Sequence, residues 1–218
     1  MRLFAPAVLA LVCAACAPPA EPPAPSTTAQ LTVVDPTRID RARDLLPAGY
    51  EVVDHTGPAG PITVWGLDGD APSQPPRCRE LAAPAVDPAS AHGWSASGPG
   101  GILYAVVAAT ASADVAPGPE LLADCRHWTA ASGHTSATVT AVSAPDIAAA
   151  ETVGLATSTT TVVEGGTETR SQADTFIAHL GDHVCFVVLV TDPGSPYPAL
   201  DAGFAAGLLV ETVATLRG

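Results

Sequence analysis

The chain has 218 residues and a net charge of −13, and its length suits one domain with short extensions. Hydrophobic residues make up 47% of it and charged residues only 14%, so it has enough apolar sequence for a globular core and is not disordered by charge. All nine basic residues are arginine and 22 acidic residues oppose them, which argues against nucleic acid as a partner, because phosphate binding needs clustered cations.

The first 15 residues resemble a secretory signal peptide. Arg2 supplies the positive charge, and residues 3–12 form an apolar stretch too short to span a bilayer. Cleavage before Cys16 leaves small residues ahead of a cysteine, as in bacterial lipoproteins, although Cys13 stands where those proteins usually have Leu or Val. We therefore expect residues 1–15 to be removed and Cys16 to be lipidated.

Residues 16–30 are rich in proline and small residues. This composition predicts an extended tether that holds the following domain away from a surface. Two acyl chains on Cys16 are enough for stable anchoring. The predicted location is the extracytoplasmic side of the cell membrane, with the membrane as the partner of the N-terminal lipid.

Residues 31–218 show neither an internal repeat nor a break in composition, which predicts one domain. Helices are predicted where apolar residues recur at helical spacing, and strands where β-branched residues cluster between turns. The predicted helices are 35–47, a short helix at Cys78, a helix at Cys125 and 201–217. The predicted strands are 50–53, 62–65, 94–97, 102–109, 136–142, 157–164, 167–180 and 183–191. We expect an α+β fold, an antiparallel sheet of about five to seven strands with N-terminal and C-terminal helices packed on it.

The segment 183–191 is apolar at consecutive positions, which predicts a central strand covered on both faces. The final helix is expected to cover one face, because its apolar residues recur at helical spacing. Those residues are Ala205, Leu208, Leu209, Val213 and Leu216. Asp201 at the start of this helix and Arg217 at its end complement the helix dipole.

Three cysteines, Cys78, Cys125 and Cys185, follow the tether. Thiols outside the cytosol tend to oxidise, so an odd number leaves one cysteine free or paired with another molecule. Cys78 and Cys125 lie in predicted helices with apolar neighbours, whereas Cys185 lies within an apolar strand, where a free thiol acts as a small hydrophobe. The pattern favours a disulfide between Cys78 and Cys125, but the sequence leaves the other pairings open.

The strongest local pattern is a β-hairpin, in which Gly165-Gly166 joins the β-branched run 157–164 to residues 167–180. Its tip carries Glu164, Glu168 and Arg170, which form a candidate interaction hairpin. The simpler interpretation is that these charges only solvate the end of the hairpin.

No motif predicts catalysis, a cofactor or a metal site. The glycines of 98–101 lead into a strand and not into a helix N-terminus, which favours a turn over a phosphate loop. His179 and His183 have the spacing of metal ligands on a helix, but Gly181-Asp182 between them is typical of a turn. A serine hydrolase stays open as an alternative, because a triad is assembled in space.

Four segments resemble exported lipoproteins of mycobacteria and related actinobacteria, a family whose function is not established. They are 45–52 (LLPAGYEV), 93–101 (GWSASGPGG), 163–170 (VEGGTETR) and 190–195 (VTDPGS). The domain is also loosely similar to the extracellular sensor domain of a mycobacterial receptor Ser/Thr kinase, although that module has two disulfides. We expect a non-enzymatic, sensor-like module that binds a small ligand or envelope component. The alternative is an envelope protein-protein interaction module.

Overall fold

The computed structural model of the protein describes residues 33–111 and 116–218, so the predicted signal peptide, the tether and Cys16 lie outside the described residues. Its strands are β1 (Glu51–Asp54), β2 (Ser73–Gln74), β3 (His92–Gly98), β4 (Gly101–Ala109), β5 (His127–Ser132), β6 (Thr135–Val142), β7 (Glu151–Val162), β8 (Glu168–His179) and β9 (His183–Thr191). Its helices are η1 (Pro36–Leu45), η2 (Pro76–Leu81) and η3 (Pro88–Ser90), which are 3₁₀ helices, and α1 (Pro61–Val64), α2 (Pro119–Asp124) and α3 (Ala202–Arg217).

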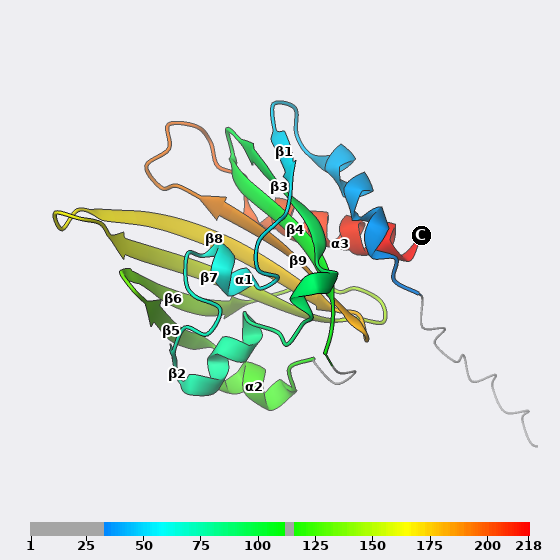
Figure 1. Ribbon diagram of the computed structural model, residues 1–218, viewed down its shortest axis with the longest axis horizontal. Coiled ribbons are helices and arrows are strands. Elements are labelled where there is room, and N and C mark those ends of the chain that lie inside the picture. Colours follow the sequence, from blue (N-terminus) through cyan, green and yellow to red (C-terminus); the bar gives the residue numbers. More distant parts are fainter. Residues whose placement is uncertain (1–32, 112–115) are drawn as a thin grey trace, which may run out of the picture. The chain divides into compact units, whose positions relative to one another are not determined.

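The described strands form one antiparallel sheet of nine strands in the order β1-β3-β4-β9-β8-β7-β6-β5-β2 (Figure 1). The sequence prediction of five to seven strands was too low, and the fold contains more sheet than we expected. The predicted central strand is confirmed: β9 lies between β4 and β8, and its residues from Val184 to Leu189 are buried on both faces.

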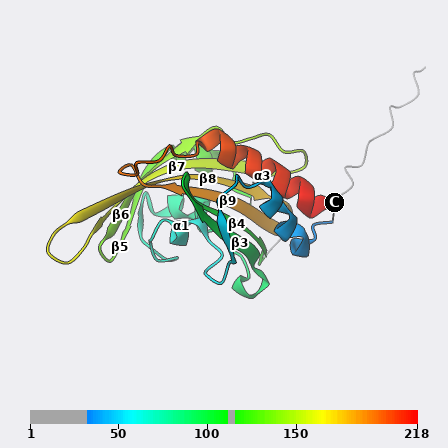
Figure 2. The ribbon, with the colours of Figure 1, turned by 90° about the horizontal axis from the view of Figure 1, so that it is seen from above.

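One face of the sheet is covered by α3 and η1 (Figure 2). The apolar face predicted for the final helix is buried throughout α3. Asp201 caps this helix by accepting a hydrogen bond from the Phe204 amide at 2.8 Å, and the Trp94 indole of β3 donates to the Ile39 carbonyl of η1 at 3.2 Å. The Trp94 bond holds η1 on the face that α3 also covers.

The N-terminal helix differs in type from the prediction. It is a 3₁₀ helix, in which the buried residues Ile39 and Ala42 lie three positions apart, as three residues per turn require. Leu45, three positions after Ala42, is 42% exposed at the end of η1.

The opposite face is covered by α1, η2, α2 and their connecting segments (Figures 1 and 2). The Trp65 indole donates to the Thr175 hydroxyl of β8 at 3.0 Å, and its ring packs against Trp128 of β5 with ring centroids 6.1 Å apart. The structure contains the disulfide between Cys78 and Cys125, which joins η2 to the end of α2, and it leaves Cys185 free and buried. This covering layer is therefore cross-linked to itself and tied to the sheet.

Two local predictions were wrong. Residues 62–65, predicted as a strand, lie in and just after α1: Pro61 begins the helix, and Ile62 and Trp65 are both buried against the sheet. Packing has overridden the β-propensity of this segment. The strand β5 was missed: His127 and Trp128, directly after the helix predicted at Cys125, begin it, and the alternating burial of His127–Ser132 fits a strand with one covered face.

Candidate functional site

The sheet has a gap at the hairpin end of β8. β7 pairs with β8 as far as Glu168, whereas β9 pairs with β8 only as far as Gln172. β9 stops at Thr191, and a turn follows in which the Ser195 amide donates to the Asp192 carbonyl at 3.0 Å. The residues of β8 from Glu168 to Ser171 therefore have no strand beside them on the β9 side.

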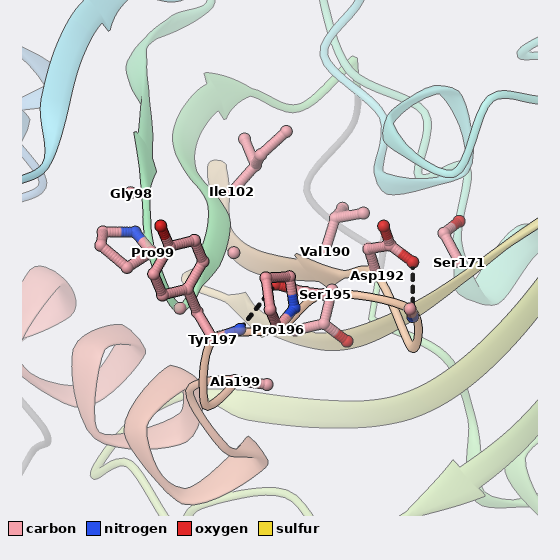
Figure 3. Close-up of a pocket in the computed structure, with 14 residues that line it drawn as sticks. Gly98, Pro99, Ile102, Ser171, Val190, Asp192, Ser195, Pro196, Tyr197 and Ala199 are labelled. Atoms are coloured by element: carbon pink, nitrogen blue, oxygen red, sulfur yellow. Dashed lines mark hydrogen bonds between the residues drawn. The ribbon is translucent and has the colours of Figure 1, made fainter.

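Two adjoining pockets occupy this gap, with volumes of about 590 and 640 Å³. Three segments line them, namely the β3–β4 turn, the start of β8 and the loop from β9 to α3 (Figure 3). We call the two pockets together the slot. The side chains used below are Ile102, Glu168, Arg170, Val190, Asp192, Pro196 and Tyr197.

The loop that follows β9 is held by its own hydrogen bonds. Asp192 Oδ1 accepts from the Gly194 amide at 2.7 Å, and Ser195 Oγ accepts from the Tyr197 amide at 3.2 Å (Figure 3). The Leu200 amide donates to the Gly100 carbonyl at 2.9 Å, which ties the loop to the β3–β4 turn. Tyr197 is thus presented at the slot with its side chain largely exposed, at 61%.

The β3–β4 turn needs its glycines for steric reasons. Gly101 has φ +130°, and a Cβ there would lie 2.6 Å from the Val190 carbonyl oxygen. A Cβ at Gly98 would lie 2.5 Å from the Tyr50 ring. Tyr50 is packed beneath the turn, and burial of its hydroxyl raises its pKa. The turn predicted from the glycine-rich sequence is therefore a rigid wall of the slot.

The Gly98→Ala substitution is expected to lower the free energy of unfolding by about 1 to 3 kcal/mol, because the added methyl group overpacks the space that the Tyr50 ring occupies. Urea unfolding measures this loss. The matched control is Gly118→Ala, where a Cβ meets no atom within 4 Å and φ is −62°. Equal stabilities of the two variants would contradict the packing of Tyr50 on the turn.

The charges at the slot are few and accessible. Arg170 Nη2 lies 3.2 Å from Glu168 Oε2, and both side chains are more than half exposed. With Asp192, the slot is lined by two carboxylates and one guanidinium, a net charge of −1. Ile102, which is 38% exposed, and Val190, which is partly buried, add apolar surface to the slot (Figure 3). This arrangement suits recognition of an apolar group with a cation at its edge.

The structure brings together part of the predicted site. Glu168 and Arg170 line the slot, whereas Glu164 lies exposed in the hairpin turn and does not. Cys78 and Cys125 do not line the slot; their disulfide cross-links the layer that covers the opposite face from α3. Asp192 and Tyr197 were missed as site residues. Residues 192–195 (DPGS) are typical of a turn, but only the pairing of β9 with β4 and β8 places that turn beside the hairpin.

The histidines of the described residues make no hydrogen bond to a serine; His55, His127 and His183 bond to Pro58, Thr140 and Asp182. His179 is on the face covered by α1, and His183, by strand alternation, is on the face covered by α3. The two residues cannot share a metal ion. No group of three or more metal-ligating side chains occurs in residues 33–111 and 116–218. Within those ranges no helix has the length and apolar character needed to cross a membrane.

Fold and slot together define a class: a nine-stranded antiparallel sheet with helices on both faces and an open pocket beside a strand edge. The chain belongs to the family described as Domain of unknown function (DUF5642), which matches residues 35–217. It is similar in structure to an uncharacterised protein from Mycobacterium smegmatis, the Rv0999 ortholog, solved by X-ray crystallography. The TM-score is 0.61 at 19% identity, over 86% of this chain and 100% of that one, which shows a shared fold. A comparison with curated proteins gives no match.

Proposed function

We propose that this protein is a lipid-anchored, non-enzymatic binding module of the cell envelope that takes a small ligand or an envelope component in the slot. The observation that carries the proposal is the pocket of about 590 Å³ beside Tyr197, a volume within the range of ligand sites. Its lining combines apolar side chains with a few polar groups at the edge, which is the usual composition of such sites.

The position of the slot in the domain supports this proposal. The Asp35 amide donates to the Leu216 carbonyl at 3.0 Å, so the chain enters the domain beside the C-terminal end of α3. The loop that lines the slot leads into the other end of α3, at Asp201. A helix of 16 residues is about 24 Å long. The chain therefore enters the described domain at the end of α3 that is remote from the slot-lining loop.

A second candidate is a protein-protein interaction module that acts through the hairpin tip. The observation that favours it is the exposure of two large apolar side chains there, Val162 at 41% and Val163 at 44%, beside Glu164. Exposed apolar residues at a rim of charges are typical of interaction surfaces.

The test is thermal unfolding of the full chain and its Tyr197→Ala variant in the presence of envelope lipids, glycans and peptides. A ligand at 100 times its Kd stabilises the folded state by about 2.7 kcal/mol. We expect at least one ligand to raise the melting temperature of the wild type and to have much less effect on Tyr197→Ala.

The control is Val142→Ala, another exposed residue. Val142 ends β6 and pairs with Gly154 near the start of β7, away from the hairpin tip. It should respond to the ligand as the wild type does. Stabilisation that survives Tyr197→Ala but is lost when Val162 and Val163 are both replaced by serine would favour the hairpin tip as the binding surface. No stabilisation by any ligand would contradict both candidates.

A further inference from the structure

Two hydrogen bonds determine which backbone groups of β8 face the slot. The Val163 amide donates to the Thr167 carbonyl at 2.9 Å, so odd-numbered residues of β8 bond to β7. The Leu180 amide donates to the His183 carbonyl at 2.8 Å, so even-numbered residues bond to β9. This alternation holds along an antiparallel ladder. The amide and carbonyl groups of Glu168 and Arg170 therefore point into the slot.

Those four backbone groups have no backbone partner among the described residues, because β9 ends its pairing at Gln172. They repeat every second residue, at a spacing of about 6.6 Å. A ligand that satisfies them all needs donors and acceptors at the same repeat, which an extended peptide has. A lipid chain laid across them would leave polar groups unpaired, at a cost in free energy.

We infer that the slot binds an extended peptide, which adds to the edge of β8 at Glu168–Ser171 as an antiparallel strand in line with β9. This inference rests on the proposed function and names the class of its ligand. Strand addition at an open sheet edge is an established mode of peptide recognition, in which backbone bonds give affinity and side-chain pockets give specificity.

The walls of the slot indicate the side chains of that peptide. Successive residues of a strand point to opposite sides. One side would meet Ile102 and Val190, and the other would meet Pro196 and Tyr197 (Figure 3). These four residues belong to the pocket that reaches β8 at Ser171, so apolar residues suit the part of the peptide beside Ser171. The pocket beside Glu168 and Arg170 adds Pro193 as its apolar side chain, and β-branched residues suit this part because they favour the extended conformation.

The charges of the slot indicate which chemical group the first residue of the peptide carries. A peptide antiparallel to β8 starts beside Asp192, whose Oδ1 caps the Gly194 amide and whose Oδ2 makes no hydrogen bond within the described residues. The slot has a net charge of −1 from Glu168, Asp192 and Arg170. A cation at the start of the peptide, either its free amino terminus or a basic side chain, complements this carboxylate.

The probe is a pool of hexapeptides that begin with Lys or Arg and continue with Val, Ile, Thr, Ala or Phe. Binding to the full chain is measured by calorimetry, and the tightest peptide is then methylated on its backbone nitrogens, in two sets of alternate residues. We expect one set to weaken binding about tenfold or more, because it removes hydrogen bonds to Glu168 and Arg170. The other set should keep its affinity within about threefold.

A substitution in the protein tests the same contact from the other side. Arg170→Pro removes an edge amide that pairs with no strand, and proline is tolerated at sheet edges. The matched control Arg170→Ala removes the side chain and keeps the amide. We expect the proline variant to bind the peptide about tenfold more weakly than the alanine variant, because both lack the arginine side chain and only the proline variant lacks the amide. Unfolding midpoints establish that both variants are folded.

The outcomes separate this inference from the proposed function. Equal effects of the two methylated sets, or of the two Arg170 variants, would overturn strand addition, and the methylated peptides give this answer even if Arg170→Pro does not fold. If no hexapeptide binds while a lipid or glycan stabilises the wild type and not Tyr197→Ala, the peptide inference fails and the binding module stands. If nothing binds, both fail.

Discussion

Replacing both Cys78 and Cys125 by alanine is expected to lower the free energy of unfolding by about 2 to 4 kcal/mol. The disulfide joins positions 47 apart in sequence and ties η2 to the end of α2. Without the cross-link the unfolded chain gains conformational freedom, which the loop-entropy account makes the main loss. Both sulfurs are buried in the layer that covers one sheet face, so the variant loses packing as well.

Urea unfolding of the oxidised wild type and the double variant measures this difference. The matched control is Cys185→Ala, which also removes a buried sulfur but breaks no cross-link. Burial raises the pKa of the Cys185 thiol to about 12, so this cysteine should stay unreactive toward alkylating agents until the protein unfolds. Identical unfolding midpoints for the wild type and the double variant would contradict a stabilising role of the disulfide.

The elements that the sequence predicts well are those whose pattern repeats along one segment. α3 follows from five apolar residues at helical spacing between Asp201 and Arg217, and β9 follows from an unbroken apolar run. Residues 62–65 were assigned to the wrong type of element, and β5 was not predicted, because both segments are short. Residues 62–65 contain three β-branched residues and a tryptophan, which fits a strand locally, and only their burial against the sheet selects a helix.

The candidate site was predictable only in part, for a similar reason. Glu168 and Arg170 could be found from the sequence because both strands of the hairpin and the turn between them are contiguous in the chain. The slot also depends on the order of strands: β9 separates β4 from β8 and ends before β8 does. No local pattern in the sequence indicates at which residue the pairing of two strands ends. The sequence therefore provides no indication that Tyr197 is a site residue, beyond its place in a turn-rich loop.

Lowering the pH from 7.5 to 4.5 is expected to cost the wild type about 2 to 3 kcal/mol of stability through His179 alone. His179, in the last position of β8, is 8% exposed, and its Nδ1 has no hydrogen-bond partner among the described residues. Burial lowers its pKa from 6.5 to about 4. The folded protein therefore keeps this imidazole neutral at pH values where the unfolded chain protonates it.

The sign follows from proton binding. Between pH 6.5 and 4 the unfolded state binds more protons at His179, so stability rises with pH in this window and is unaffected by His179 above about pH 7.5. Asp174 acts in the opposite sense, because burial and the nearby Asp201 raise the pKa of its carboxyl group. A comparison of variants removes the contribution of Asp174, because all variants share this carboxyl group.

The measurement is urea unfolding at pH 7.5 and 4.5 for the wild type, His179→Gln and the control His127→Gln. His127 is exposed on β5, and its Nδ1 lies 3.1 Å from the Thr140 hydroxyl oxygen. His179→Gln should lose about 2 to 3 kcal/mol less than the wild type on acidification, because glutamine does not titrate. His127→Gln should follow the wild type. If His179→Gln loses as much stability as the wild type, the buried neutral imidazole does not govern the acid sensitivity of this fold.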